Sequence, residues 1–296
     1  MEIRKVQKTG NMHYLYLPTS WCKKHKITAD TNISINQLQD GTLSIIPKIA
    51  EQKEKSITLK ISEDNPDIIH KLIIACYINP ASSFKIIFEN EIKPSSLLDQ
   101  KRLISLENVE IDNKHISCES DVTISDPASL LRTMSRKIKN LLALIISNYD
   151  EEIITRYEDE IDKSKLLIDK CVISAMTFSK QVKMTMIELY YISIISRELE
   201  RIVDNIILLD KKEKVLIESC AAAINSLNQI LEATTDASRK TELDILTAID
   251  FIKKTLQIKT QITGDSNKAR NISNSFINIA DVITDWAITN QIESRD

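Results

Sequence analysis

The C-terminal part of the chain nearly lacks the two residue types that interrupt helices. Residues 127–296 contain one proline, Pro127, and one glycine, Gly264, among many helix-forming residues. Apolar residues recur there at spacings of three and four, a pattern typical of amphipathic helices. Breaks in the pattern predict six helices, at residues 128–147, 151–178, 182–209, 213–234, 240–260 and 268–289. Because the connections are short, consecutive helices should be antiparallel. We expect two all-α three-helix bundles in tandem, at about residues 127–209 and 211–292.

Residues 1–49 carry the pattern of short strands instead. Apolar runs and turn residues predict a short helix at 21–25 and strands at 3–6, 14–17, 33–35 and 42–46. The first two strands are separated by a turn at 8–11, Thr19 or Ser20 can cap the helix, and Asp40-Gly41 is a tight-turn pair. This head offers too little core for a stable monomer, so we expect a second copy of the chain to complete it as a homodimer.

The middle of the chain mixes both patterns. Residues 50–55 are polar and are interpreted as a linker. Beyond them, a helix is predicted at 66–77 and strands at 57–61, 84–88, 109–111 and 115–124. This alternation indicates a small α/β layer. The 296 residues therefore predict a multidomain α+β protein, with domains at 1–49, 56–125 and 126–292.

Several classes of protein are excluded by composition. Gly10, Gly41 and Gly264 lie far apart, whereas the phosphate loops of nucleotide enzymes need clustered glycines. The five cysteines are dispersed and odd in number, which is typical of free thiols in a reducing compartment. No apolar run is long enough for a membrane span, and the first residues lack a secretory signal. We expect a cytoplasmic protein, and the absence of a catalytic motif predicts that it is not an enzyme.

Charge is distributed unevenly between the two ends. The net charge is −3, yet residues 1–26 hold six Lys/Arg against one acid, Glu2. Lysines and arginines gathered on one face release counterions from DNA phosphates, so this segment is a candidate DNA-binding surface. The alternative is a solvated basic rim that only assists dimerisation.

Two acidic pairs stand out in the helical half. Glu158 and Asp162 are four residues apart, and Glu200 and Asp204 repeat this spacing one helix later. Like charges at this spacing repel each other on a helix, and a cation bound by all four carboxylates would remove the repulsion. All four histidines precede this half, so oxygen ligands would favour Mg, Mn, Ca or Fe ions. Ordinary ion pairs with Arg197 and Arg201 are the alternative.

An ordered set of motifs runs through the head. They are Arg4-Lys5-Val6-Gln7-Lys8-Thr9-Gly10, Tyr14-Leu15-Tyr16-Leu17-Pro18, Trp21 and Lys26-Ile27-Thr28-Ala29-Asp30. In this order they resemble the AbrB/SpoVT/MazE family over about residues 2–48. The resemblance implies a swapped-hairpin β-barrel made by two chains. It also implies DNA contacts through Arg4, Lys5 and Lys8, with Lys23 and Lys24 as further candidates.

A second set of motifs lies in the helical half. It consists of Asp126-Pro127 followed by Leu130-Leu131-Arg132, of Glu158 and Asp162, and of Arg197-Glu198-Leu199-Glu200-Arg201-Ile202-Val203-Asp204. Together they resemble the PhoU family of phosphate-uptake regulators, which are tandem three-helix bundles. The resemblance implies metal binding by Glu158, Asp162, Glu200 and Asp204. The middle segment is similar to the insert of archaeal-type proteins that fuse an AbrB-like head to a PhoU-like body.

These resemblances imply a phosphate-responsive regulator that binds DNA as a homodimer and controls phosphate uptake. The alternative is a protein–protein adaptor that acts on a phosphate transporter's ATPase or on a sensor kinase. In that case the head would serve only for dimerisation. A third interpretation makes the acidic bundle a metal-buffering or hydrolytic site.

Overall fold

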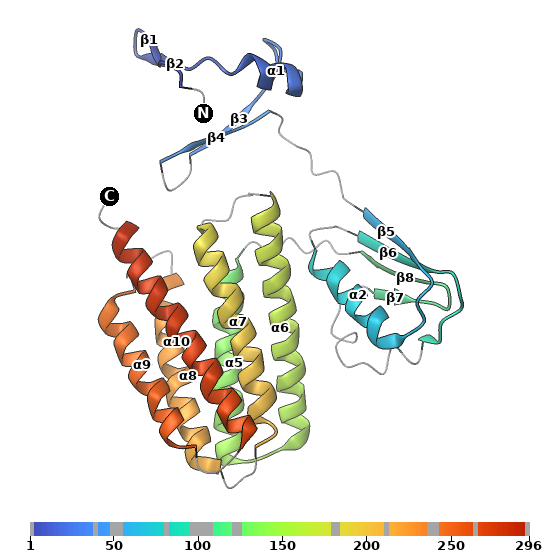
Figure 1. Ribbon diagram of the computed structural model, residues 1–296, viewed down its shortest axis with the longest axis vertical. Coiled ribbons are helices and arrows are strands. Elements are labelled where there is room, and N and C mark those ends of the chain that lie inside the picture. Colours follow the sequence, from blue (N-terminus) through green and yellow to red (C-terminus); the bar gives the residue numbers. More distant parts are fainter. Residues whose placement is uncertain are drawn as a thin grey trace. The chain divides into compact units, whose positions relative to one another are not determined.

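The protein divides into two compact units, Met1–Lys53 and Glu54–Asp296, in the computed structural model (Figure 1). The structure describes residues 3–37, 41–47, 56–79, 83–94, 97, 109–119, 126–178, 184–209, 213–235, 243–262 and 266–293. The described part is mostly helical, with small sheets. The first unit is called the head below.

The head begins with a hairpin that differs from the predicted one. Strands β1 (Gln7–Thr9) and β2 (Met12–Tyr14) pair antiparallel across a turn at Gly10. Gly10 has a φ of 61°, a left-handed conformation that glycine adopts without strain. Because the turn lies here, Gln7–Thr9 before it pair with Met12–Tyr14 after it. The strands predicted at 3–6 and 14–17 are therefore wrong in position.

A short helix and a second hairpin complete the head. Helix α1 (Thr19–His25) starts after Pro18, so the predicted capping by Thr19 or Ser20 is wrong, since both residues lie inside the helix. Strands β3 (Ser34–Gln37) and β4 (Leu43–Ile46) pair antiparallel, within two residues of the predicted hairpin. Asp40 of its predicted turn lies outside the described residues.

The α/β layer has one helix on a four-stranded sheet. Its strands are β5 (Ser56–Ile61), β6 (Ser83–Phe88), β7 (Val109–Ile111) and β8 (His115–Glu119), in the order β5-β6-β8-β7. Strands β5 and β6 are parallel, and the other pairs are antiparallel. Helix α2 (Pro66–Ile78) starts at the cap Asn65, whose side chain accepts a hydrogen bond from the Asp67 N–H. The predicted extension of β8 over 120–124 lies outside the described residues.

Six helices make up the described body after residue 126. They are α5 (Pro127–Ser147), α6 (Glu151–Phe178), α7 (Met186–Ile206), α8 (Lys214–Thr235), α9 (Ile245–Thr260) and α10 (Asn267–Glu293). Side chains of Asp126, Thr185 and Asp244 cap α5, α7 and α9. Their apolar stripes meet in one core that extends from Ala128 to Ala287. The prediction of a helical C-terminal region is confirmed.

The packing partners of these helices divide them into halves. Helix α6 packs on α5 and α7, and α9 packs on α8 and α10 (Figure 1). The halves join where α5 contacts α8 and α7 contacts α10. None of the described strands closes into a barrel. The two-chain barrel predicted for the head stays a prediction. No described helix has both the length and the apolar character that a membrane crossing requires.

The α/β layer is anchored to α6 by one apolar and one charged side chain. Leu166 of α6 is buried in the core of the layer, and the Nζ of Lys170 lies 4.4 Å from the centroid of the Tyr77 ring. Burial of Lys170 lowers the pKa of its ammonium, and the nearby thiols of Cys118 and Cys171 act in the opposite direction. The ring of Tyr77 offers this cation a favourable neighbour in place of water.

Buried positions of the helical core should dominate stability. Ile272 and Ile292 both lie on α10, but Ile272 is fully buried whereas Ile292 is 64% exposed. Ile272→Ala is expected to lower the free energy of unfolding by about 2–5 kcal/mol, because it leaves a cavity. Ile292→Ala should change it by less than about 0.5 kcal/mol. Urea unfolding followed by circular dichroism checks the pair, and equal effects would contradict this description of the core.

The lowered pKa of Lys170 predicts a pH dependence. The unfolded chain holds this proton more tightly than the folded one, so stability should rise as pH increases from the lowered pKa to the ordinary value of about 10.4. Lys170→Met should remove this rise of stability with pH. The control Lys60→Met, at an exposed lysine, should keep it. Urea midpoints measured between neutral and alkaline pH test this, and parallel curves for wild type and Lys170→Met would refute it.

Candidate nucleic-acid interface

The five cations predicted to contact DNA all lie on exposed parts of the head. Arg4 and Lys5 precede β1, and Lys8 belongs to β1. Lys23 and Lys24 lie in the last turn of α1, where positive charge is favourable beside the helix C-terminus. These side chains therefore lie on β1, on α1 and in the segment before β1, all within one compact unit, and Arg4 has an interaction partner in the protein.

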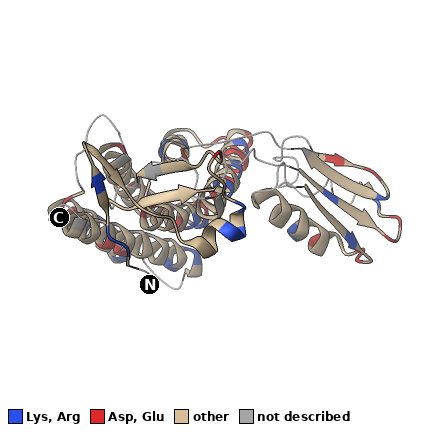
Figure 2. Cartoon of the chain, turned by 90° about the horizontal axis from the view of Figure 1, so that it is seen from above, with Lys and Arg blue, Asp and Glu red and all other residues tan. Residues whose placement is uncertain are grey.

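The charge of the described head is almost entirely positive. Its described residues include six Lys/Arg and one acid, Asp30 (Figure 2). His13 lies directly opposite Lys8 in the β1–β2 register, so a histidine adjoins the basic strand. The rings of His25 and Trp21 are in contact, with centroids 5.1 Å apart. Such a surface attracts polyanions.

One further cation was not among those predicted to contact DNA. Lys26 ends α1 with a φ of 55°, and its backbone N–H donates to the carbonyls of Cys22 and Lys23. Its side chain is exposed and continues the run Lys23-Lys24-His25. The sequence feature that could have identified Lys26 is the run Lys23-Lys24-His25-Lys26. Consecutive residues of a helix point to different sides, so a run of four surrounds the end of a short helix.

Apolar side chains are also exposed on the head. No described residue of this unit is buried, and large apolar side chains are largely in solvent. Examples are Ile3, Val6, Tyr16, Ile35 and Leu43. A unit of this kind has no core of its own, which is the physical condition for folding together with a partner surface.

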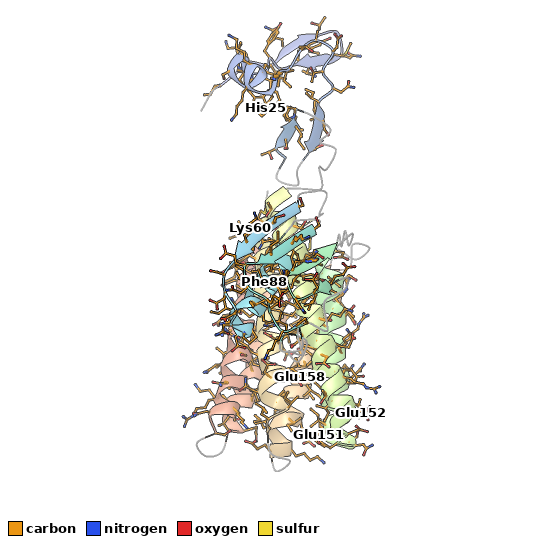
Figure 3. All side chains as sticks on the ribbon, turned by 90° about the vertical axis from the view of Figure 1, so that its right-hand side faces the viewer. His25, Lys60, Phe88, Glu151, Glu152 and Glu158 are labelled. Atoms are coloured by element: carbon orange, nitrogen blue, oxygen red, sulfur yellow. The ribbon has the colours of Figure 1, made fainter. Side chains whose placement is uncertain are left out.

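The four carboxylates predicted to bind metal lie on two helices that pack together. Glu158 and Asp162 are on α6 and Glu200 and Asp204 on α7, and all four are half-buried. Figure 3 labels Glu158 on its helix. Each of them has an interaction partner within the protein. Among the described residues no three His, Cys, Asp or Glu side chains are grouped closely enough to hold a metal ion. Metal binding by divalent or iron ions therefore stays a prediction from the sequence.

A neighbouring carboxylate is more buried than any of these four. The Glu198 side chain is 3% exposed, and its Oε1 accepts a hydrogen bond from Arg201 Nη1 at 3.0 Å. Arg197 Nε lies 4.0 Å from the same oxygen, and Oε2 has no hydrogen-bond partner. The predicted alternative had paired these arginines with Glu200 and Asp204. The spacing of three and four from Ile195 to Ile202 already places position 198 on the buried stripe.

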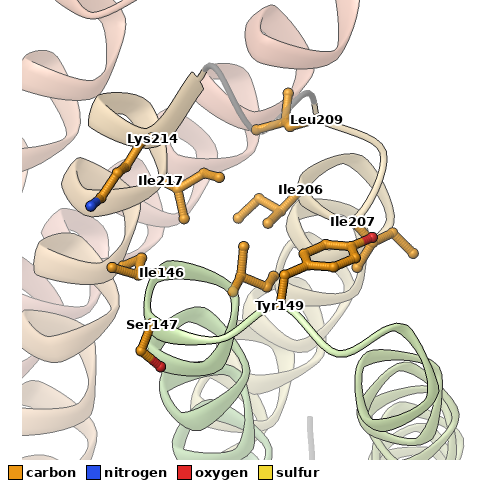
Figure 4. A pocket seen from close by; sticks show the side chains of 9 residues that line it. Ile146, Ser147, Tyr149, Ile206, Ile207, Leu209, Lys214 and Ile217 are labelled. Atoms are coloured by element: carbon orange, nitrogen blue, oxygen red, sulfur yellow. The ribbon is translucent and has the colours of Figure 1, made fainter.

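A pocket of about 240 Å³ lies where α5, α7 and α8 end or begin (Figure 4). Aliphatic side chains such as Ile146, Ile206 and Ile217 line most of it, and Tyr149 and Lys214 supply polar atoms. Lys214 also lies 3.9 Å from Glu218. Proteins hold phosphate with several converging N–H donors or cations, so this apolar lining does not suit a phosphate ion.

The basic residues of the head and the acidic pairs of α6 and α7 stay predictions of function from the sequence. Searches against family models, against curated proteins and against solved structures give no match for this chain. Its function is inferred from the geometry of these surfaces and from the motifs of the sequence.

Proposed function

We propose that this chain is a dimeric DNA-binding regulator that responds to phosphate and controls phosphate uptake. The observation that carries the proposal is the charge of the head, where exposed cations stand on β1, on α1 and in the segment before β1, and where one acid is described. The rest of the chain is acidic on balance, since the whole carries −3. The positive surface is therefore a local feature of one unit.

The physical basis is the release of counterions. Each Lys or Arg placed on a DNA phosphate frees condensed cations and adds salt-dependent affinity. A homodimer brings two copies of Arg4, Lys5, Lys8, Lys23 and Lys24 to one duplex. Neither copy needs to contact bases for this part of the affinity, so sequence preference has to come from further contacts in the grooves.

Dimerisation is supported by the exposed apolar side chains of the head. The β3–β4 hairpin leaves Ile35 and Leu43 in solvent, and Ile3 and Val6 before β1 are also exposed. A second copy can cover these side chains and pair with the open strand edges. In this proposal the two heads interleave into the swapped-hairpin barrel of the AbrB-like family.

The link to phosphate is supported by sequence alone. The capped start of α5 at Asp126 and the acidic pairs of α6 and α7 match the motifs that resemble PhoU proteins. In this proposal the body consists of tandem three-helix bundles that pass the phosphate signal to the head through partner proteins.

The basic head predicts a definite salt dependence of DNA binding. Replacing Arg4, Lys5 and Lys8 by Ala should weaken binding and flatten the plot of log affinity against log salt, by about 0.9 for each phosphate that is no longer neutralised. The control replaces three exposed lysines outside the head, Lys60, Lys71 and Lys139, and should leave both values unchanged.

Fluorescence anisotropy measures this with a duplex from the gene's own upstream region and a scrambled duplex, at several salt concentrations. Preference for the first duplex supports a sequence-reading regulator. Absence of binding at low salt overturns the proposal and favours the adaptor acting on a transporter ATPase or sensor kinase.

The exposed hairpin predicts how the head associates. Leu43→Glu should shift the protein to a smaller species and reduce DNA affinity, because it places a charge on the apolar surface that the second copy covers. Leu208→Glu, at a similarly exposed leucine of the other unit, is the matched control and should change neither property. Sedimentation velocity at low micromolar concentration checks the mass. A Leu43→Glu protein with unchanged mass would exclude dimerisation through this hairpin.

A further inference from the structure

Helices α6 and α9 hold equivalent places in the two halves of the body. Each is the middle helix of its half and packs on the helices before and after it. Their buried positions follow the same spacing of four and three. They are Ile168, Val172 and Ala175 on α6, and Phe251, Thr255 and Ile258 on α9. The two helices therefore turn matching faces to the common core, and their outward faces match as well.

The outward face of α6 is covered by the α/β layer. Leu166 and Lys170 lie on this face, and both are buried. Leu166 belongs to the apolar core of the layer, and Lys170 lies over the ring of Tyr77. An outward face with this arrangement is thus a docking surface within the same chain.

The outward face of α9 has the same arrangement but is left in solvent. Ile249 and Lys253 correspond to Leu166 and Lys170 in spacing and in residue class. Leu246 lies three residues before Ile249 and Leu256 seven residues after it, so both extend the same face. Leu246 is 72% exposed, Ile249 40% and Leu256 50%. This set, Leu246, Ile249, Lys253 and Leu256, is called the α9 seam below.

We propose that the α9 seam is a second self-association surface, which packs antiparallel on the α9 seam of another copy of this chain. A two-fold axis across the middle of the seam sets Leu246 of each copy against Leu256 of the other, and Ile249 against Lys253. The seam is therefore complementary to itself, as an interface between identical copies must be. Its spacing of three, four and three is that of the paired helices of a coiled coil.

The charges on α9 agree with the antiparallel direction. A two-fold axis perpendicular to the helices brings the same flank of each copy together, and Asp250 lies on the flank next to Lys253. Each Lys253 is then level with Ile249 of the second copy, and Asp250 of that copy lies about one residue, or about 1.5 Å, from this level along the axis. Asp250 keeps its bond to Lys254 at 2.7 Å on the side of α8. A single lysine in such a seam fixes the register at a cost in affinity.

The seam is short, so the association is weak by itself. It spans about three turns, or about 15 Å, and belongs to the small class of transient interfaces. Linkage through the head dimer raises the effective concentration of neighbouring seams. The complete protein should therefore form assemblies larger than a dimer as its concentration rises.

The test separates the seam from the head by using the Leu43→Glu protein, in which the head does not pair. Sedimentation equilibrium of this full-length variant, over a range up to about 0.2 mM, should show a reversible monomer–dimer step. Adding Leu246→Glu and Leu256→Glu should weaken this step at least about tenfold, because the two new charges face each other in place of an apolar pair. Adding Leu208→Glu and Val215→Glu instead, at equally exposed apolar positions, is the matched control and should leave the step unchanged.

A second variant gives an effect in the opposite direction. Lys253→Leu in the Leu43→Glu protein should tighten the dimer about threefold or more, because it removes the polar position from the seam. Circular dichroism confirms that each variant is folded. A strictly monomeric Leu43→Glu protein, or a monomer–dimer step that the two seam glutamates leave unchanged, overturns the proposal. Since the head is disabled in every variant, either outcome is independent of DNA binding and of the head dimer.

Discussion

The body depends on one constraint, which is that each of its six described helices must bury an apolar stripe against the others. The stripes of α5, α7, α8 and α10 meet along two contacts, α5 with α8 and α7 with α10, and these contacts hold the two halves together. Fully buried side chains such as Leu131, Phe251 and Trp286 lie in this single core. The α/β layer packs on a face of α6 that this core leaves uncovered.

The head is the opposite case, because it has almost nothing to bury within one chain. Two hairpins and α1 satisfy their backbone hydrogen bonds locally, yet Ile35 and Leu43 remain in water. Short hairpins are marginal in isolation, so this unit gains most of its stability from whatever covers those side chains. Coupling to a second chain also doubles its cations. In the proposed function, stability and DNA affinity would thus favour the same assembly.

Sequence periodicity predicts the helices well because each one buries a stripe, and it fails where a single local or tertiary contact decides. Six helices could be predicted from the spacing of apolar residues and the breaks between them. The start of α7 was predicted at 182 and lies at Met186, although Thr185 and Glu188 form a capping box that marks it. The first hairpin was misplaced because Gly10, and not the apolar run after it, sets the pairing. The burial of Lys170 depends on a layer from a distant part of the sequence, which no local pattern reports.

The candidate sites follow the same division between local pattern and tertiary contact. Exposure of Arg4, Lys5, Lys8, Lys23 and Lys24 could be expected from charge alone, since isolated lysines and arginines stay in water. Glu198 was overlooked because a carboxylate on a buried stripe is costly, and only the arginines beside it make the position tolerable. The comparison of α6 with α9 required both levels. The sequence holds the same outward pattern on α6 and on α9. The α/β layer covers this face of α6, whereas Leu246, Ile249 and Leu256 of α9 stay exposed. Only the structure shows this difference, which indicates that the face of α9 can bind a partner.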